Sequence, residues 1–212
     1  MSIIRFEGGN PFISVDNSPS LTSGMDKPKL FGEWSFEEVT VRDLGLQRYI
    51  NLDPIYLPHS GGRHEARRFK KSELNIVERL VNSLMHPGSS GGEKTRIINA
   101  VRKAFKIINL RTGRNPIEVL VRAIENAAPN EDTTRISYGG VVYRVAVDIS
   151  PQRRVDLALR FIAQGTRLEA FRSRKTLAEA LADQLIGAAN NDTNNYAIRK
   201  KLEQERIALA SR

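Results

Sequence analysis

The sequence contains no cysteine among its 212 residues, which excludes disulfide bonds, thiolate zinc sites and cysteine nucleophiles. Its three histidines, His59, His64 and His86, have no carboxylate pair nearby, so we expect no metal site and no cofactor. Apolar runs are short, and none approaches the roughly 20 residues that span a bilayer. The N-terminus also lacks the apolar core of a signal peptide. These absences predict a cytoplasmic protein without a membrane partner.

Positive charge is unevenly distributed along the chain. Residues 1–62 contain 5 basic and 8 acidic side chains, a net charge of −3, whereas residues 63–212 contain 28 and 16, a net charge of +12. A basic domain predicts a polyanionic partner, with nucleic acid ahead of an acidic membrane surface. The alternative is a protein that is merely soluble and basic. The charge shift divides the chain into an N-terminal extension, 1–62, and a basic domain, 63–212.

The N-terminal extension is rich in residues that favour turns. Glycine, proline, asparagine and serine recur through residues 1–30, which we expect to be loop or disordered. Residues 30–57 contain more apolar side chains, including the only tryptophan, Trp34. There we expect short strands and one helical turn, docked on the main domain.

Six segments of the basic domain have the apolar periodicity or the end signals of helices. Asn115-Pro116 is a typical helix start, because asparagine caps the first turn and proline fits its first position. Thr176 and Glu179 have the spacing of a capping box. The predicted helices cover residues 72–86, 93–110, 115 to Pro129, 151–171, 176–190 and 195 onwards.

The clearest strand signal lies at residues 134–149, where apolar side chains alternate with others. In its middle, Gly139-Gly140 tolerates the positive φ that a type I′ turn requires. We therefore predict a hairpin with its tip projecting as an arm and its inner face packed on helices near the base: Tyr143, Val145, Val147 and Ile149. The predicted fold is mainly α, a six-helix domain with a protruding two-stranded hairpin between the third and fourth helices, plus an irregular N-terminal extension.

Three clusters of basic side chains fit contact with phosphates. In the run 63–71, five of nine residues are basic and one aromatic is interleaved, although a solvated helix start is the alternative. The helix at 93–110 has basic residues at three- and four-residue steps without acidic partners at i, i+4. Arg153 and Arg154 lie in the first turn of a helix, where the helix dipole disfavours cations, so phosphates are a plausible reason for them.

Enzymatic functions are weakly supported. Residues 89–95 resemble a P-loop, but Glu93 separates Gly92 from Lys94 and a helix precedes the segment instead of a strand. An enzyme acting on RNA would need a convergent acid–base set, and the sequence shows no histidine–carboxylate pair or metal triad. We therefore predict that the chain is not an enzyme and has no small-molecule substrate. A free nucleic-acid-binding regulator of helix-turn-helix type is the alternative.

Several motifs together make residues 30–212 resemble a known family. They lie at residues 30–35, 58–63, 76–85, 115–121 and 150–154, and the second of them reads Pro-His-Ser-Gly-Gly-Arg. The chain resembles ribosomal small-subunit head protein number seven, in the archaeal and eukaryotic branch whose eukaryotic members are numbered five. The hairpin with Gly139, Gly140 and Tyr143 is also similar to that of the bacterial branch.

The resemblance implies a function and a set of contacts. Members of the family bind the 3′ major domain of small-subunit ribosomal RNA (rRNA), nucleate assembly of the head, and contact neighbouring small-subunit proteins. Their hairpin approaches exit-site tRNA and mRNA. The implied rRNA-binding residues are Arg63, Arg67, Arg68, Lys70, Lys71, Lys94, Arg96, Arg102, Lys103, Lys106, Arg111, Arg114, Arg153 and Arg154. The implied hairpin residues near tRNA and mRNA are Arg135, Tyr138, Gly139, Gly140 and Arg144.

Overall fold

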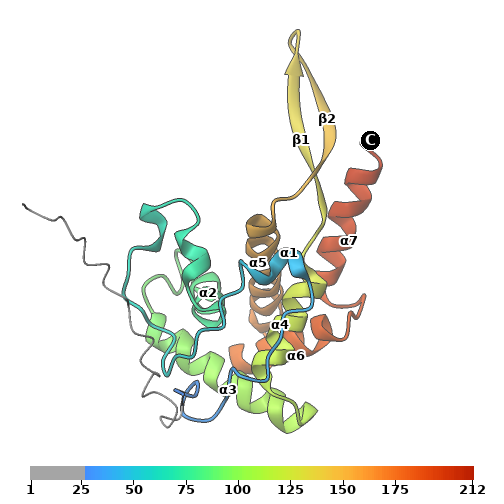
Figure 1. Ribbon diagram of the computed structural model, residues 1–212. Coiled ribbons are helices and arrows are strands. Elements are labelled where there is room, and N and C mark those ends of the chain that lie inside the picture. The colour runs from blue at the N-terminus through green and yellow to red at the C-terminus, as the bar shows by residue number, and fades with distance from the viewer. Residues whose placement is uncertain (1–26) are drawn as a thin grey trace, which may run out of the picture.

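The computed structural model describes residues 27–212 and shows a helical body from which a two-stranded arm projects (Figure 1). The expectation for residues 1–26 lies outside the described part of the chain. A one-turn helix, α1 (Leu44–Gln47), and two 3-10 turns, His64–Ala66 and Lys70–Glu73, precede the body helices. These are α2 (Ile76–Leu84), α3 (Lys94–Thr112), α4 (Pro116–Ala127), α5 (Pro151–Ala170), α6 (Leu177–Ala189) and α7 (Tyr196–Leu209). The predicted class, six helices with a hairpin between the third and fourth, is confirmed.

Side-chain caps decide where several of these helices begin. Asn75, Asn115 and Asn195 each accept a hydrogen bond from the backbone N–H two residues further on. Thr176 forms the predicted capping box with Glu179. Such bonds satisfy N–H groups that have no partner inside the helix. The predicted start of the first body helix at residue 72 is wrong, because a 3-10 turn occupies that position and Asn75 starts the helix afterwards.

The body helices share one hydrophobic core. Its fully buried side chains include Phe105 of α3, Leu120 and Ile124 of α4, Leu159 and Ile162 of α5, and Leu181 of α6. The same core contains Leu30, Phe36, Leu46 and Ile50 from the segment before α2. Each such side chain stabilises the fold by roughly 1.5–3 kcal/mol when buried. Within residues 27–212, no helix combines the length and the apolar character needed to cross a bilayer.

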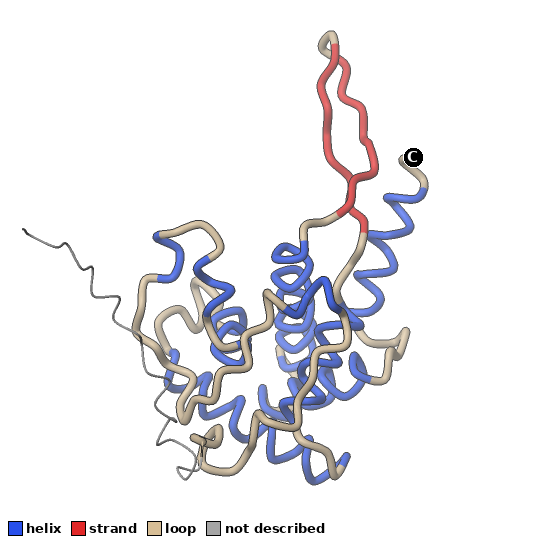
Figure 2. Tube along the Cα trace, in the orientation of Figure 1, coloured by secondary structure: helices blue, strands red, loops and turns tan. Residues whose placement is uncertain are grey.

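The arm is an isolated antiparallel ribbon of β1 (Glu131–Tyr138) and β2 (Val141–Asp148). Gly139 and Gly140 have φ values of 59° and 83°, as the predicted turn requires. At the base, β1 packs against α7, whose C-terminal end lies beside it, while the tip stands away from the body (Figure 2). The arm therefore holds its shape by its own backbone hydrogen bonds and by contacts at the base.

The two faces of the arm are exposed over most of its length. Tyr143, Val145 and Val147 are 54%, 39% and 40% exposed, whereas Ile149, just beyond β2, is buried. The predicted packing of an inner face on the helices is therefore wrong for these three residues. Alternation of apolar side chains shows that a face exists, but it does not show that another element covers that face.

Candidate nucleic-acid interface

The structure separates the predicted rRNA-binding cations into two groups. Eight make ion pairs within the protein: Lys71, Lys94, Arg96, Arg102, Lys106, Arg111, Arg153 and Arg154. Six have no carboxylate partner among residues 27–212, and we call them the open cations: Arg63, Arg67, Arg68, Lys70, Lys103 and Arg114. A phosphate meets no competing carboxylate at an open cation.

Lys94 belongs to a buried cluster. Its ammonium donates to Glu78 at 2.5 Å, and the same carboxylate accepts from the N–H and the hydroxyl of Ser60, both at 3.0 Å. Glu78 is only 3% exposed. Burial acts to raise the pKa of Glu78, but the hydrogen bonds from Lys94 and Ser60 outweigh it and lower the pKa below its ordinary value. The cluster fixes the loop before the basic run against α2 and α3.

An acidic residue from the segment before α1 covers part of the basic face of α3. Glu33 accepts from Lys106 at 2.9 Å and from Arg102 at 3.3 Å. The hydrogen bond from Lys106, followed by that from Arg102, lowers the pKa of Glu33. Sequence reasoning missed this partner because Glu33 lies 69 positions from Arg102. Lys103, on the same helix, is exposed and remains an open cation.

Internal acceptors hold the two arginines at the start of α5. Arg154 pairs with Asp43 at 3.1 Å and donates its Nε–H to the carbonyl of Pro129 at 3.3 Å. These contacts offset the unfavourable position of Arg154 at the start of a helix, so no bound phosphate is needed to explain it. Arg153, which is itself exposed, makes one ion pair, with the half-buried Asp132 at 3.3 Å. Such a pair contributes little, so Arg153 is accessible to a ligand.

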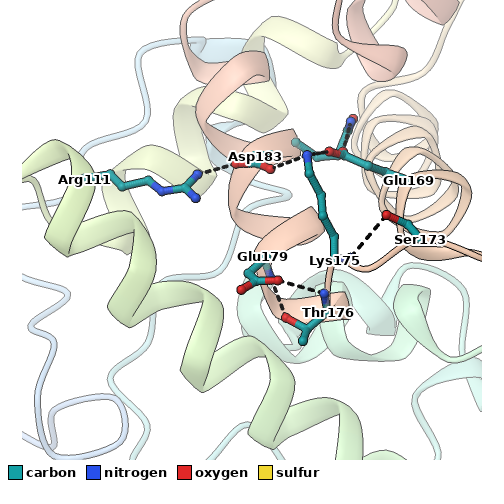
Figure 3. Close-up of polar contacts among 8 residues, drawn as sticks. Arg111, Glu169, Ser173, Lys175, Thr176, Glu179 and Asp183 are labelled. Carbon is teal, nitrogen blue, oxygen red and sulfur yellow. Dashed lines mark hydrogen bonds and ion pairs between the residues drawn. The ribbon is translucent and has the colours of Figure 1, made fainter.

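Arg111 belongs to a charged network that joins three helices (Figure 3). Arg111 of α3 and Lys175, just before α6, both donate to Asp183 of α6, and Lys175 also pairs with Glu169 of α5. Burial opposes ionisation of Asp183, but hydrogen bonds from Lys175 and Arg111 lower its pKa. The hydrogen bonds to Glu169 and Asp183 raise the pKa of Lys175. Arg111 thus has a structural role, and its contact with rRNA stays a prediction.

An open groove of about 410 Å³ lies between the basic run and the start of α5, and we call it the Phe69 groove. Its cationic and ring-bearing lining consists of Arg67, Arg68, Phe69, Lys71 and Arg153, beside the amide of Gln152. Two carboxylates also line it. That of Asp156 is neutralised by Lys71 at 2.7 Å and Arg79 at 2.8 Å. The charge that an incoming ligand meets is therefore mainly positive.

Phe69 is held in a strained conformation at the edge of this groove. Its φ of 65° lies in the left-handed region, which costs a residue other than glycine about 1–3 kcal/mol. The Arg68 guanidinium lies over its ring, 4.9 Å from the centroid, and Phe69 remains 48% exposed. Strain of this kind is concentrated at ligand-contacting sites. The interleaved aromatic is visible in the sequence, but its backbone conformation is not, so sequence reasoning did not select it.

The arm presents two chemically different faces, because directly opposed residues of a ribbon share a face. One face is mainly apolar and carries Ile136, Tyr138, Val141, Tyr143 and Val145. The other carries Arg135 opposite Arg144, with Ser137 opposite Val142. Tyr138, at the tip, is 81% exposed. All the predicted hairpin residues thus lie on the exposed part of the arm.

Comparison with known proteins assigns the sequence to a family. Residues 46–212 match the model of the family described as "Ribosomal protein S7p/S5e". The chain belongs to this ribosomal protein family. It is also 56% identical, over 191 residues, to the small ribosomal subunit protein uS7 of Cenarchaeum symbiosum (strain A), covering 86% of this chain and 96% of that protein. The predicted resemblance to the archaeal branch is confirmed.

Membership in the S7p/S5e family decides the class of function. The chain is a structural, RNA-binding protein of the small ribosomal subunit that takes part in translation, and it is not an enzyme. The open cations, the Phe69 groove and the exposed arm are therefore surfaces of a protein whose partners are rRNA and other ribosomal proteins.

Proposed function

We propose that the chain binds the 3′ major (head) domain of small-subunit rRNA and nucleates assembly of the head, with its arm near exit-site tRNA and mRNA. In this proposal residues 63–212 form the RNA-binding domain, residues 134–149 form its arm, and residues 1–62 form an N-terminal extension. The extension contributes side chains to the core and the carboxylate of Glu33 to α3. Neighbouring small-subunit proteins are the expected partners of the remaining surface.

The observation that carries the proposal is the concentration of open cations in one loop. Four of the six lie within residues 63–70, namely Arg63, Arg67, Arg68 and Lys70. Phosphates bound there would release condensed counterions, which is the main source of affinity in protein–nucleic acid complexes. The other two, Lys103 and Arg114, lie on α3 and in the turn that follows it.

Recognition of RNA shape follows from the same arrangement. The deep, narrow groove of A-form RNA excludes side chains, so a helical protein reads the backbone and the shallow groove of a duplex. The open cations lie on a loop that follows the Glu78 cluster, on α3 and in the turn after α3. The backbone positions of these cations are set by the fold, which favours one RNA shape over others.

The test is a binding titration with a transcript of the head domain. We expect Lys103→Glu to weaken binding about tenfold at ~0.15 M salt, because it replaces an attraction to phosphate with a repulsion. We expect the further substitution Lys106→Glu to weaken binding by less than Lys103→Glu does, because Lys106 is already paired with Glu33 in the free protein. Unchanged affinity of Lys103→Glu would remove α3 from the interface.

The matched control for this titration is Arg174→Glu. Arg174 is exposed, has no ion-pair partner within residues 27–212, and lies outside the proposed interface. Its substitution makes the same change in net charge, so only a local effect separates the two variants. Tighter binding of the wild-type protein to duplex DNA than to the transcript would instead favour a free regulator of helix-turn-helix type.

The proposal for the arm rests on its reach and its two faces. The tip lies beyond the helical body, so it is available to a partner other than the rRNA that the body binds (Figure 1). Arg135 and Arg144 suit phosphates, while Tyr138 offers a ring on which a base stacks. Both features fit a tRNA or an mRNA strand at the exit site.

A further inference from the structure

We infer that the Phe69 groove binds a single unstacked nucleotide of the rRNA, with its base against Phe69 and its phosphate between Arg67 and Arg153. This inference rests on the proposed function, because it names the RNA feature that the basic run recognises. It also adds a specific aromatic contact to an interface otherwise composed of phosphate contacts.

The aromatic side of the groove is suited to stacking. Phe69 projects from a basic loop, is 48% exposed, and has the guanidinium of Arg68 over its ring. Bases taken out of a helix stack on aromatic rings and on guanidinium planes. Within a duplex, both faces of a base are already covered by its neighbours. A ring presented in this way therefore favours an extruded base over a duplex backbone.

The side chain of Gln152 provides the polar side of the groove. Gln152 lines the groove and is only 9% exposed, yet its side chain makes no hydrogen bond with any residue in 27–212. A nucleotide in the groove would supply both donors and acceptors for this amide, from its base edge or from the ribose hydroxyl.

The start of α5 adds a place for the phosphate. The side chain of Ser150, which precedes the helix, makes no capping hydrogen bond, so the backbone N–H groups of Gln152 and Arg153 are without an acceptor from it. Free N–H groups at a helix start bind anions. Arg67 is an open cation on the facing loop, and Arg153 is exposed beside the same N–H groups.

The size of the groove fits one nucleotide. Its volume of about 410 Å³ lies within the range of about 300–1,000 Å³ for small-ligand sites. Of the two carboxylates in the lining, Asp156 is neutralised by Lys71 and Arg79, and Glu65 is exposed with its carboxylate 4.0 Å from the ammonium of Lys71. Together the ring, the amide and the cations match the three parts of a nucleotide.

Binding of the full-length protein to the head-domain transcript tests the inference. We expect Phe69→Leu, which keeps apolar bulk but removes the stacking surface, to weaken binding about 5- to 150-fold. The slope of affinity against salt should not change, because no cation is lost. Gln152→Leu should weaken binding about 2- to 10-fold through loss of its hydrogen bonds. Chemical probing should show an unpaired nucleotide that wild-type protein protects and Phe69→Leu leaves reactive.

The matched control is Phe171→Leu. Phe171 is an exposed phenylalanine with an arginine over its ring, Arg172 at 5.2 Å, but it lies at the opposite end of α5. The Phe171→Leu variant should bind the transcript with an affinity within twofold of that of the wild-type protein. Equal affinities of Phe69→Leu and Phe171→Leu, both folded by circular dichroism, would overturn the inference. If Lys103→Glu still weakens binding, the proposed function survives. Failure of wild-type protein to bind the transcript overturns both.

Discussion

At the residue scale, the ammonium of Lys94 and the buried carboxylate of Glu78 form an ion pair inside the protein. Lys94→Met leaves the carboxylate without its charged donor, so we expect the free energy of unfolding to fall by about 3 kcal/mol. Urea unfolding followed by circular dichroism measures it. Lys103→Met, at an exposed open cation, is the control and should stay within about 0.5 kcal/mol of wild type. Equal stability of Lys94→Met and wild type would show that the cluster does not hold the loop.

The carboxylates of Glu78 and Asp183 make stability depend on pH in a defined direction. Both have a pKa lowered in the folded protein, from ordinary values of 4.5 and 3.8. Their stabilisation is therefore present above those values and is lost as pH falls through the folded pKa. Asp183→Asn should differ from wild type most near neutral pH, and the difference should vanish well below pH 3.8. Urea midpoints of the two proteins, measured between pH 7 and pH 2.5, test this expectation. A difference in midpoint that stays constant over that range would contradict it.

At the scale of elements, the sequence predicted the helix starts and the hairpin turn that depend on a few neighbouring residues. Asn115-Pro116 and the Thr176–Glu179 box start their helices where the sequence indicates, because a cap acts within one turn. Gly139-Gly140 likewise fixes the turn of the arm. The start of α2 was missed because the apolar Leu74 continues the helical rhythm into a 3-10 turn, and rhythm alone does not distinguish the two.

The partners of the cations were less predictable than the cations themselves. Glu33 reaches Arg102 across 69 positions, and Asp183 reaches Arg111 across 72. Only the packing of distant elements brings such residues together, so charge spacing along one helix could not show them. The strain at Phe69 has the same explanation, since the backbone conformation there is set by the fold around the loop.

The arm itself can be tested as an independent element. Replacing residues 135–144 by Asn-Gly keeps the pairs at the base and removes the exposed ribbon. We expect the unfolding free energy and the affinity for the head-domain transcript to remain unchanged, because the removed part packs on no helix. Subunits reconstituted with this variant should then differ from wild-type subunits in their retention of exit-site tRNA. Loss of subunit assembly in this variant would show instead that the arm is part of the rRNA-binding structure.

For the whole molecule, the division between paired and open cations predicts the salt dependence of binding. If the six open cations contact phosphates, the slope of log affinity against log salt should be about −4 to −5, at roughly 0.7–0.9 per phosphate. If all fourteen predicted residues did so, it would be about −10 to −13. Titrations at several salt concentrations distinguish the two. A slope in the steeper range would mean that the internal ion pairs open when RNA binds.

The opposed arginines of the arm, Arg135 and Arg144, have a consequence for the protein before it meets a ribosome. A two-stranded ribbon has two open edges, and each is a template on which another copy could add a strand. With its mainly apolar face, such an arm would be prone to polymerise. Like charges directly opposite each other weaken the ribbon slightly, but they also make two arms repel. We expect this pair to keep newly made chains apart until RNA phosphates neutralise it.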